Sequence, residues 1–315
     1  MKNTNPDLLL THLLITGEMR SGTTFLANFL NSQVGCSVYS DLLKSWLNEP
    51  AKLRLPTLST ALDPRQKNVL FSNLIAEGLL FGLTCFEKID RTRITTALEL
   101  FQEAMHSLAS PDGCLVGVKV TRQYGYLPEL MDHGVKVIFC IRDPRDMLLS
   151  AKNRFSEYNL FESVAAWKKS LQLAKGLDDR PNFYLLRFES LMEETTRMAE
   201  IARLAQFLDV PLDPHITKLK MRNNVEFVSN SSFGDVSRVF DSQALFRWRR
   251  DPQSSEVIFA SAFLEKEIAE LDYQSFPTLP KEYARLRQAY YAYIIKRQIK
   301  NVILKFYKKI FSGGV

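Results

Sequence analysis

The stretch Leu13–Leu30, "LLITGEMRSGTTFLANFL", sets a glycine-framed loop between two apolar segments. A nucleotide-binding phosphate loop has the pattern G-x-x-x-x-G-K-[ST], in which the lysine contacts the outer phosphates and the hydroxyl binds magnesium. Gly17 and Gly22 keep this frame, but Thr23 stands in place of the lysine. Because N–H groups at a helix N-terminus attract anions without a lysine, the loop still predicts an anion site.

The residues next to the second glycine supply the donors of this site. The backbone N–H groups of Ser21, Gly22, Thr23 and Thr24 converge on one point at the start of a helix. Arg20 brings a cation from the other side. An ordinary turn between a strand and a helix also explains a single glycine loop, so the loop needs a second motif beside it.

The composition of the chain argues against several classes of protein. The chain has 315 residues, 46% of them hydrophobic, and a formal net charge of +6. This charge suits an anionic cofactor or an acidic acceptor and is too small and dispersed to indicate nucleic acid. The first residues fit neither a signal peptide nor a membrane span, so we expect a cytoplasmic protein. The spacing of cysteines and histidines predicts no disulfide and no metal site.

Apolar runs that alternate with helical patterns predict the fold. The runs are rich in β-branched and aromatic residues, which favours buried strands. Their alternation with helices predicts a three-layer α/β/α fold around a mostly parallel central sheet. The predicted strands are the run that ends at Thr16, Cys114–Val120, Val135–Ile141 and Asn182–Phe188, and the predicted helices are Asp146–Phe155, Ser163–Lys175 and Glu193–Leu208.

Two segments differ from this alternation within an expected domain of residues 1–280. Residues 41–113 form a predicted helical insertion, which we expect to line the acceptor pocket, although its phenylalanines fit plain helical packing as well. Residues 281–315 form a predicted tail whose helical part is basic and amphipathic. Such a helix lies on an anionic membrane surface, packs on its own domain or forms a dimer, and its sequence alone does not separate these outcomes.

A second anion motif occurs in the segment Val135–Ser150, "VKVIFCIRDPRDMLLS". Arg142 ends a predicted strand, and Ser150 follows eight residues later on a helix. An arginine fork and a hydroxyl placed in this way bind one phosphate from two sides. A surface turn with a capping aspartate explains "RDPRD" alone, but two anion motifs that each follow a strand argue against chance.

With both motifs the sequence resembles the sulfotransferase superfamily, which transfers a sulfuryl group from 3'-phosphoadenosine 5'-phosphosulfate (PAPS) and releases 3',5'-ADP (PAP). In that family a [K/R]-x-G-T-T loop holds the 5'-phosphosulfate. "RSGTT", Arg20–Thr24, looks like its arginine form and is closer to the tyrosylprotein and bacterial branch than to the cytosolic branch. The resemblance implies that Arg142 and Ser150 bind the 3'-phosphate.

The resemblance extends from about Leu8 to Trp248. "GVKVTRQYGYLPEL" is similar to the family stretch with a catalytic lysine, which implies this role for Lys119. "SSFGDVSRVFDSQALFRWRRD" looks like the late loop that closes over the nucleotide, with Ser232 and Arg247 as the implied contacts. "LLRFESLMEE" resembles the R-Y-E-D-L segment, but Phe188 replaces the usual tyrosine and loses its hydroxyl.

Sulfuryl transfer requires cations that stabilise charge on the leaving group and a base that takes the acceptor proton. The resemblance assigns the cationic role to Arg20 and Lys119. Cytosolic members carry a histidine two residues after the lysine, where this chain has Thr121, whereas related branches use a carboxylate that matches Asp41. A helix N-cap explains Asp41 as well. The alternatives for the base are Glu18, His106 and His133.

The sequence therefore predicts a metal-free, PAPS-dependent sulfotransferase that acts on a hydroxyl of a carbohydrate, a lipid or another small metabolite. A kinase that uses ATP and magnesium is the first alternative. The missing loop lysine and the additional arginine–serine pair argue against it. A sulfotransferase-like protein that binds the nucleotide without turnover is the second alternative. The acceptor and the oligomeric state stay open at this point.

Overall fold

The computed structural model describes residues 10–221, 239–276 and 282–311. The chain divides into two compact units, residues 1–142 with 170–245 and residues 143–169 with 246–315. Each unit has its own hydrophobic cluster. The first unit holds the sheet, and the second is helical in its described part.

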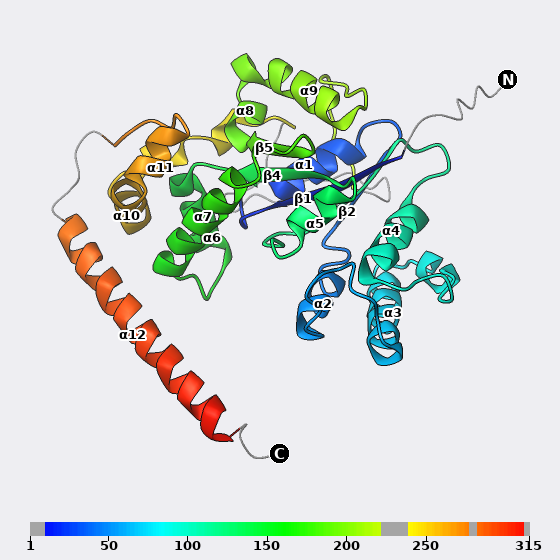
Figure 1. Cartoon of the computed structure of the whole chain (residues 1–315). Coiled ribbons are helices and arrows are strands. Elements are labelled where there is room, and N and C mark those ends of the chain that lie inside the picture. The colour runs from blue at the N-terminus through cyan, green and yellow to red at the C-terminus, as the bar shows by residue number, and fades with distance from the viewer. Residues whose placement is uncertain (1–9, 222–238, 277–281, 312–315) are drawn as a thin grey trace. The chain divides into compact units, whose positions relative to one another are not determined.

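The first unit is built on a parallel five-stranded sheet with the strand order β2-β3-β1-β4-β5 (Figure 1). The first strand lies in the middle and pairs with β3 on one side and with β4 on the other. Because all strands run in the same direction, the residues that follow them gather at one edge of the sheet. The strands are β1 Thr11–Gly17, β2 Cys36–Ser40, β3 Leu115–Lys119, β4 Lys136–Ile141 and β5 Phe183–Arg187.

Helices cover both faces of this sheet, which confirms the predicted three-layer arrangement. Leu13 of β1 packs in one cluster with Leu26 and Leu204, whereas its neighbour Leu14 packs in another with Phe101. Both faces of the strand are apolar, so each needs a helical layer. The helices of this unit are α1 Thr23–Asn31, α2 Glu49–Lys52, α3 Pro64–Leu80, α4 Ala97–Leu108, α5 Leu127–Asp132, α8 Phe188–Met192 and α9 Glu194–Leu208, with the 3-10 helices η1 Trp46–Asn48, η2 Cys85–Lys88 and η3 Ser242–Ala244.

The four predicted strands are present, but the edge strand β2 is not among them. Its sequence, CSVYS, is interrupted by two serines and lacks the continuous apolar run that marked the other strands. The strand forms through tertiary pairing, since it lies parallel to β3 in a register from Cys36 opposite Leu115 to Ser40 opposite Lys119. This pairing brings the ends of β2 and β3 together.

The segment predicted as a helical insertion contains helices and one isolated bridge between Ala61 and Thr96. Its two longer helices, α3 and α4, each begin with a capping box, which satisfies backbone donors at the helix start. Phe71, Phe86 and Phe101 are almost completely buried in the core cluster. These three rings therefore serve helical packing, and a pocket-lining role of the insertion stays a prediction.

The second unit contains helices from two parts of the chain. A buried ion pair between Arg145 and Asp143 (2.7 Å) holds the start of its first helix. The helix α7, Leu160–Lys175, crosses from this unit to the first. In the described ranges, no helix is both long enough and apolar enough to span a membrane. The helices of this unit are α6 Pro144–Arg154, α10 Ser255–Phe263, α11 Glu265–Glu270 and α12 Glu282–Phe311, with the 3-10 helix η4 Arg247–Arg249.

The sequence-based division into a domain of residues 1–280 and a tail of residues 281–315 stays a prediction. Helix α12 occupies almost the whole helical part of that tail.

Candidate active site

The loop between β1 and α1 lies at the carboxyl edge of the sheet, where parallel strands present functional groups. Arg20 (φ 70°) and Gly22 (φ 90°) have left-handed backbone conformations, so the chain turns sharply before the helix begins at Thr23. Of the residues that the structure describes, none caps this helix through a side chain, and its first turn contains no acidic residue. The first N–H groups of α1, including that of Thr24, thus have the arrangement of a helix start that binds an anion.

Ser21 gives independent support for a ligand at this loop. The residue is 1% exposed, and its Oγ has no hydrogen-bond partner among the described residues. A buried polar group without a partner costs about 1–3 kcal/mol, so such a hydroxyl is normally bonded. A phosphate or sulfate oxygen at the start of α1 would satisfy it. The loop thus fits the phosphosulfate group that the sequence predicts.

Lys119 ends β3, and its side chain is only 4% exposed. Its Nζ lies 3.0 Å from Oδ2 of Asp41, which follows β2 directly and has a left-handed backbone (φ 63°). The N–H of Asp41 also donates to the carbonyl of Lys119 (2.8 Å). The charge of Lys119 also acts on Cys140 of β4. Burial raises the pKa of this thiol, and the positive charge of Lys119 partly offsets that rise. The predicted catalytic lysine and the predicted base are thus in direct contact.

A second carboxylate lies in the loop itself. Glu18 is 2% exposed and accepts hydrogen bonds from Nε of Arg122 (2.7 Å) and from the hydroxyl of Tyr124 (3.0 Å). Burial, and after it the charge of Glu18, raises the pKa of Tyr124, so this hydroxyl stays protonated and donates. The N–H of Arg122 donates to the carbonyl of Gly17 (3.1 Å). This cluster ties the loop to the segment after Lys119, and both Glu18 oxygens accept bonds within it.

Arg142 follows β4 directly and is 6% exposed. Its guanidinium donates to the carbonyl of Arg20 (3.2 Å) and to the carbonyl of Ala244 (2.6 Å). The same group lies 4.9 Å from the ring centroid of Phe188. That ring packs against the loop, since a Cβ on Gly22 would stand 2.1 Å from it. The structure therefore brings the two predicted anion-binding arginines, Arg20 and Arg142, to adjacent positions.

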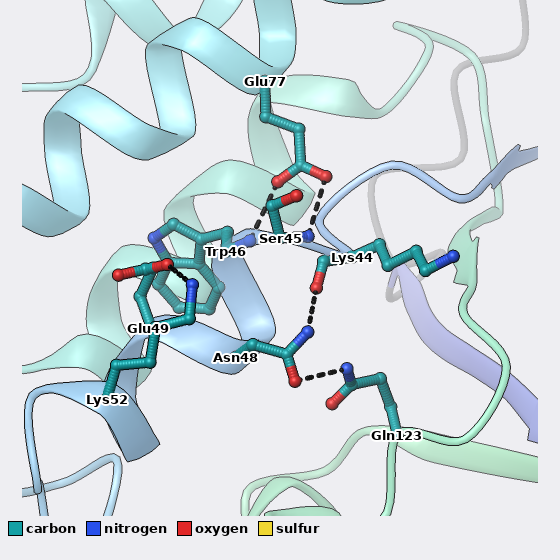
Figure 2. A network of polar contacts seen from close by, with 8 residues as sticks. All are labelled: Lys44, Ser45, Trp46, Asn48, Glu49, Lys52, Glu77 and Gln123. Carbon is teal, nitrogen blue, oxygen red and sulfur yellow. Dashed lines mark hydrogen bonds and ion pairs between the residues drawn. The ribbon is translucent and has the colours of Figure 1, made fainter.

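A polar network holds the segment after β2 in place (Figure 2). Glu77 of α3 is buried and accepts from the N–H groups of Ser45 (3.1 Å) and Trp46 (2.9 Å) at the start of η1. Asn48 at the end of η1 accepts from Nε2 of Gln123 (3.0 Å). Because the predicted base begins this segment, the network restricts its position as well.

Two of the predicted site residues belong to the second unit. Ser150 is buried in α6, and Arg247 begins η4, both in the second unit. The residue after Arg247 is fixed, because the N–H of Trp248 donates to Asp146 (2.9 Å). That Ser150 and Arg247 bind the nucleotide together with residues of the first unit stays a prediction. Ser232 lies outside the described residues.

Two alternatives for the base do not reach the site. His106 is exposed in the last turn of α4, which leads into the amino end of β3. His133 is exposed directly after α5, which leads into the amino end of β4. Both histidines therefore belong to the edge of the sheet opposite Lys119.

Two residues of the site, Arg122 and Tyr124, are absent from the sequence prediction. Their only sequence signal is their place directly after the predicted lysine, in "KVTRQY".

Within the described ranges, no group of three or more histidine, cysteine, aspartate or glutamate side chains could hold a metal ion.

Comparisons with known proteins identify a matching family model and a curated relative. The model of the sulfotransferase domain family matches residues 10–251. Sulfotransferase 2A1 of Homo sapiens is 23% identical over 171 residues, which are 45% of this chain and 59% of that protein. The chain thus matches less than two thirds of the length of this curated relative.

Two solved structures are similar to this chain, and the first of them shows a similar fold. The sulfotransferase domain from the curacin biosynthetic pathway has a TM-score of 0.51 and 17% identity, over 85% of this chain and 99% of that chain. Retinol dehydratase, solved with androsterone and the inactive cofactor PAP, has a TM-score of 0.42 and 17% identity, over 86% of this chain and 84% of that chain.

Proposed function

This chain belongs to the sulfotransferase domain family, and from that premise we propose that it transfers a sulfuryl group from PAPS to an acceptor hydroxyl. The products are a sulfate ester and PAP, and the acceptor is a carbohydrate, a lipid or another small metabolite. One observation carries the proposal: the uncapped start of α1, the buried Lys119 and Arg142 all lie at the ends of adjacent parallel strands. A cytoplasmic location belongs to the same proposal.

Different residues of the site bind the nucleotide and stabilise the charge on the leaving group. Bound PAPS supplies the sulfuryl group. The N–H groups at the start of α1 and the Ser21 hydroxyl bind phosphate oxygens, while Arg142 binds the 3'-phosphate. Lys119, which is screened from water, stabilises the negative charge that grows on the leaving oxygen.

Asp41 takes the proton of the acceptor hydroxyl in this proposal. Its side chain is 47% exposed whereas that of Lys119 is 4% exposed, so the carboxylate is accessible to an acceptor and the ammonium stays inside. When Asp41 gains the proton, it loses its negative charge and with it the ion pair to Lys119. The ammonium is then free to interact with the leaving oxygen at the moment when charge develops there.

A thermal-shift titration separates this proposal from the kinase alternative. We expect PAP to raise the melting temperature and ATP with magnesium to leave it unchanged, because a ligand that binds only the folded state stabilises it by mass action. Arg142→Ala should abolish the PAP shift. The matched control, Arg93→Ala, removes an arginine whose side chain is 85% exposed and should keep the shift. A shift with ATP and magnesium alone would replace the proposal by a kinase.

Turnover of PAPS distinguishes an enzyme from a protein that only binds the nucleotide. We expect Asp41→Asn to lower kcat by about 100-fold or more, with the PAP affinity retained. Asp132→Asn changes an exposed, ion-paired aspartate far from the site and serves as the control. Unchanged turnover in Asp41→Asn would remove the base assignment. PAP binding without transfer to any of a panel of hydroxyl acceptors would favour the binding protein.

A further inference from the structure

Helix α12 has two apolar faces, and one of them is packed within the second unit. Tyr290 lies 4.4 Å from Phe263 and 5.5 Å from Phe259, measured between ring centroids. Tyr293 lies 5.6 Å from Phe161. These aromatic contacts anchor the helix to its own unit, which explains part of its amphipathic pattern.

The other apolar face is not explained by this packing. Tyr291, Ile295, Ile299 and Ile303 are 53%, 56%, 54% and 48% exposed. Residues four apart lie above one another on a helix, so the four side chains form a continuous line about 18 Å long. We call these four residues the exposed stripe. Large apolar side chains at this regular spacing indicate a binding surface, whereas single exposed ones do not.

The charge of the helix indicates what the stripe binds. α12 contains eight lysine and arginine residues and one acidic residue, a formal charge of +7 in thirty residues. The whole chain carries +6, so the remaining residues together are close to neutral. Arg285, Arg287 and Lys296 are exposed on the described part of the helix. A row of apolar side chains among basic residues is typical of helices that lie in the interface of an anionic bilayer.

A second copy of the chain is a poorer partner for this surface. Two copies joined through their exposed stripes would bring two helices of charge +7 together, and like charges at an interface cost free energy. A bilayer that contains acidic lipids has the opposite charge, and each basic residue near its surface contributes favourably.

We propose that the exposed stripe is a docking surface for an anionic lipid bilayer, with α12 lying in the plane of the interface. The apolar side chains enter the boundary between headgroups and acyl chains, and the basic residues contact acidic headgroups. The opposite face of the helix stays packed on α10, so docking requires no unfolding of the second unit. This inference does not depend on the proposed transfer reaction.

Vesicle co-sedimentation of the full chain tests the proposal. We expect binding to phosphatidylcholine vesicles with about 30% phosphatidylserine, little binding to pure phosphatidylcholine, and weaker binding as salt rises. Ile295→Gln combined with Ile299→Gln leaves the charge unchanged and should weaken binding about 10-fold or more. The charge variant Arg285→Gln, Arg287→Gln and Lys296→Gln should weaken it by a similar factor.

Ala289→Gln changes an exposed position of the same helix outside the exposed stripe and is the matched control, expected to bind like the unchanged chain. All substituted side chains are exposed, so the melting temperatures should agree within the set. Equal binding of the double isoleucine variant and the control would overturn the proposal. A dimer in sedimentation velocity that this variant abolishes, without vesicle binding by the unchanged chain, would also overturn it and assign the stripe to a second copy.

Discussion

Gly22 is the position where the loop geometry makes its most direct prediction. The residue has φ 90°, and a Cβ added to it would stand 2.1 Å from Cδ2 and 2.6 Å from Cε2 of Phe188. That ring is held in turn by an edge-on contact with Phe25 (6.1 Å between centroids) and by the guanidinium of Arg142. In Gly22→Ala, therefore, either the ring or the loop must move.

The loss in free energy of unfolding caused by Gly22→Ala is the sum of a backbone term and a steric term. A left-handed backbone costs a non-glycine residue about 1–2 kcal/mol. Carbon atoms in contact stand about 3.5–4.0 Å apart, so the ring must retreat by roughly 1.5 Å. Overpacking of this kind costs about 1–3 kcal/mol. We expect Gly22→Ala to lower the free energy of unfolding by about 2–5 kcal/mol in all.

The assay is urea unfolding combined with a PAP titration. Gly82→Ala is the matched control, because Gly82 has φ 68° and no atom within 4 Å of an added Cβ, so it carries the backbone term alone. In the double variant with Phe188→Ala the steric term should disappear, and the two substitutions should not be additive. If Gly22→Ala is no more destabilising than Gly82→Ala, the argument that Phe188 sets the loop geometry is wrong.

Two further predictions concern the surroundings of the site. Because burial and Glu18 raise the pKa of Tyr124 above its ordinary value of 10.0, the folded state keeps a proton that the unfolded chain loses, so the free energy of unfolding should fall as pH rises above 10.0. Tyr124→Phe should make that fall smaller in urea unfolding between pH 8 and 11, and an identical pH dependence would contradict the assignment. Glu77→Ala leaves the N–H groups of Ser45 and of the buried Trp46 without their acceptor and should cost about 1–3 kcal/mol. Lys52→Ala, which removes a lysine that is 64% exposed, should cost less than about 0.5 kcal/mol, and equal costs would contradict the role of Glu77.

Local sequence was sufficient for most secondary structure and for the loop. Strands β1, β3, β4 and β5 are continuous apolar runs, and the helices after them have their own periodicity, so both appear in a window of a few residues. The short strand β2 was missed because pairing with β3, far along the chain, stabilises it. Local sequence also did not show the role of Phe71, Phe86 and Phe101. Their pattern fitted a pocket lining and a core equally, and the tertiary packing places them in the core.

The sequence by itself determined the order of strands β1, β3, β4 and β5 and of the helices between them, and it predicted the loop after β1 as an anion site, because these depend on residues close together in the chain. Only the tertiary structure decided which groups meet. Lys119 and Asp41 are 78 residues apart, Glu18 and Arg122 are 104 apart, and Arg142 and Arg20 are 122 apart. Such contacts arise from the order of parallel strands in the sheet and from burial that excludes water, and neither property belongs to a single segment.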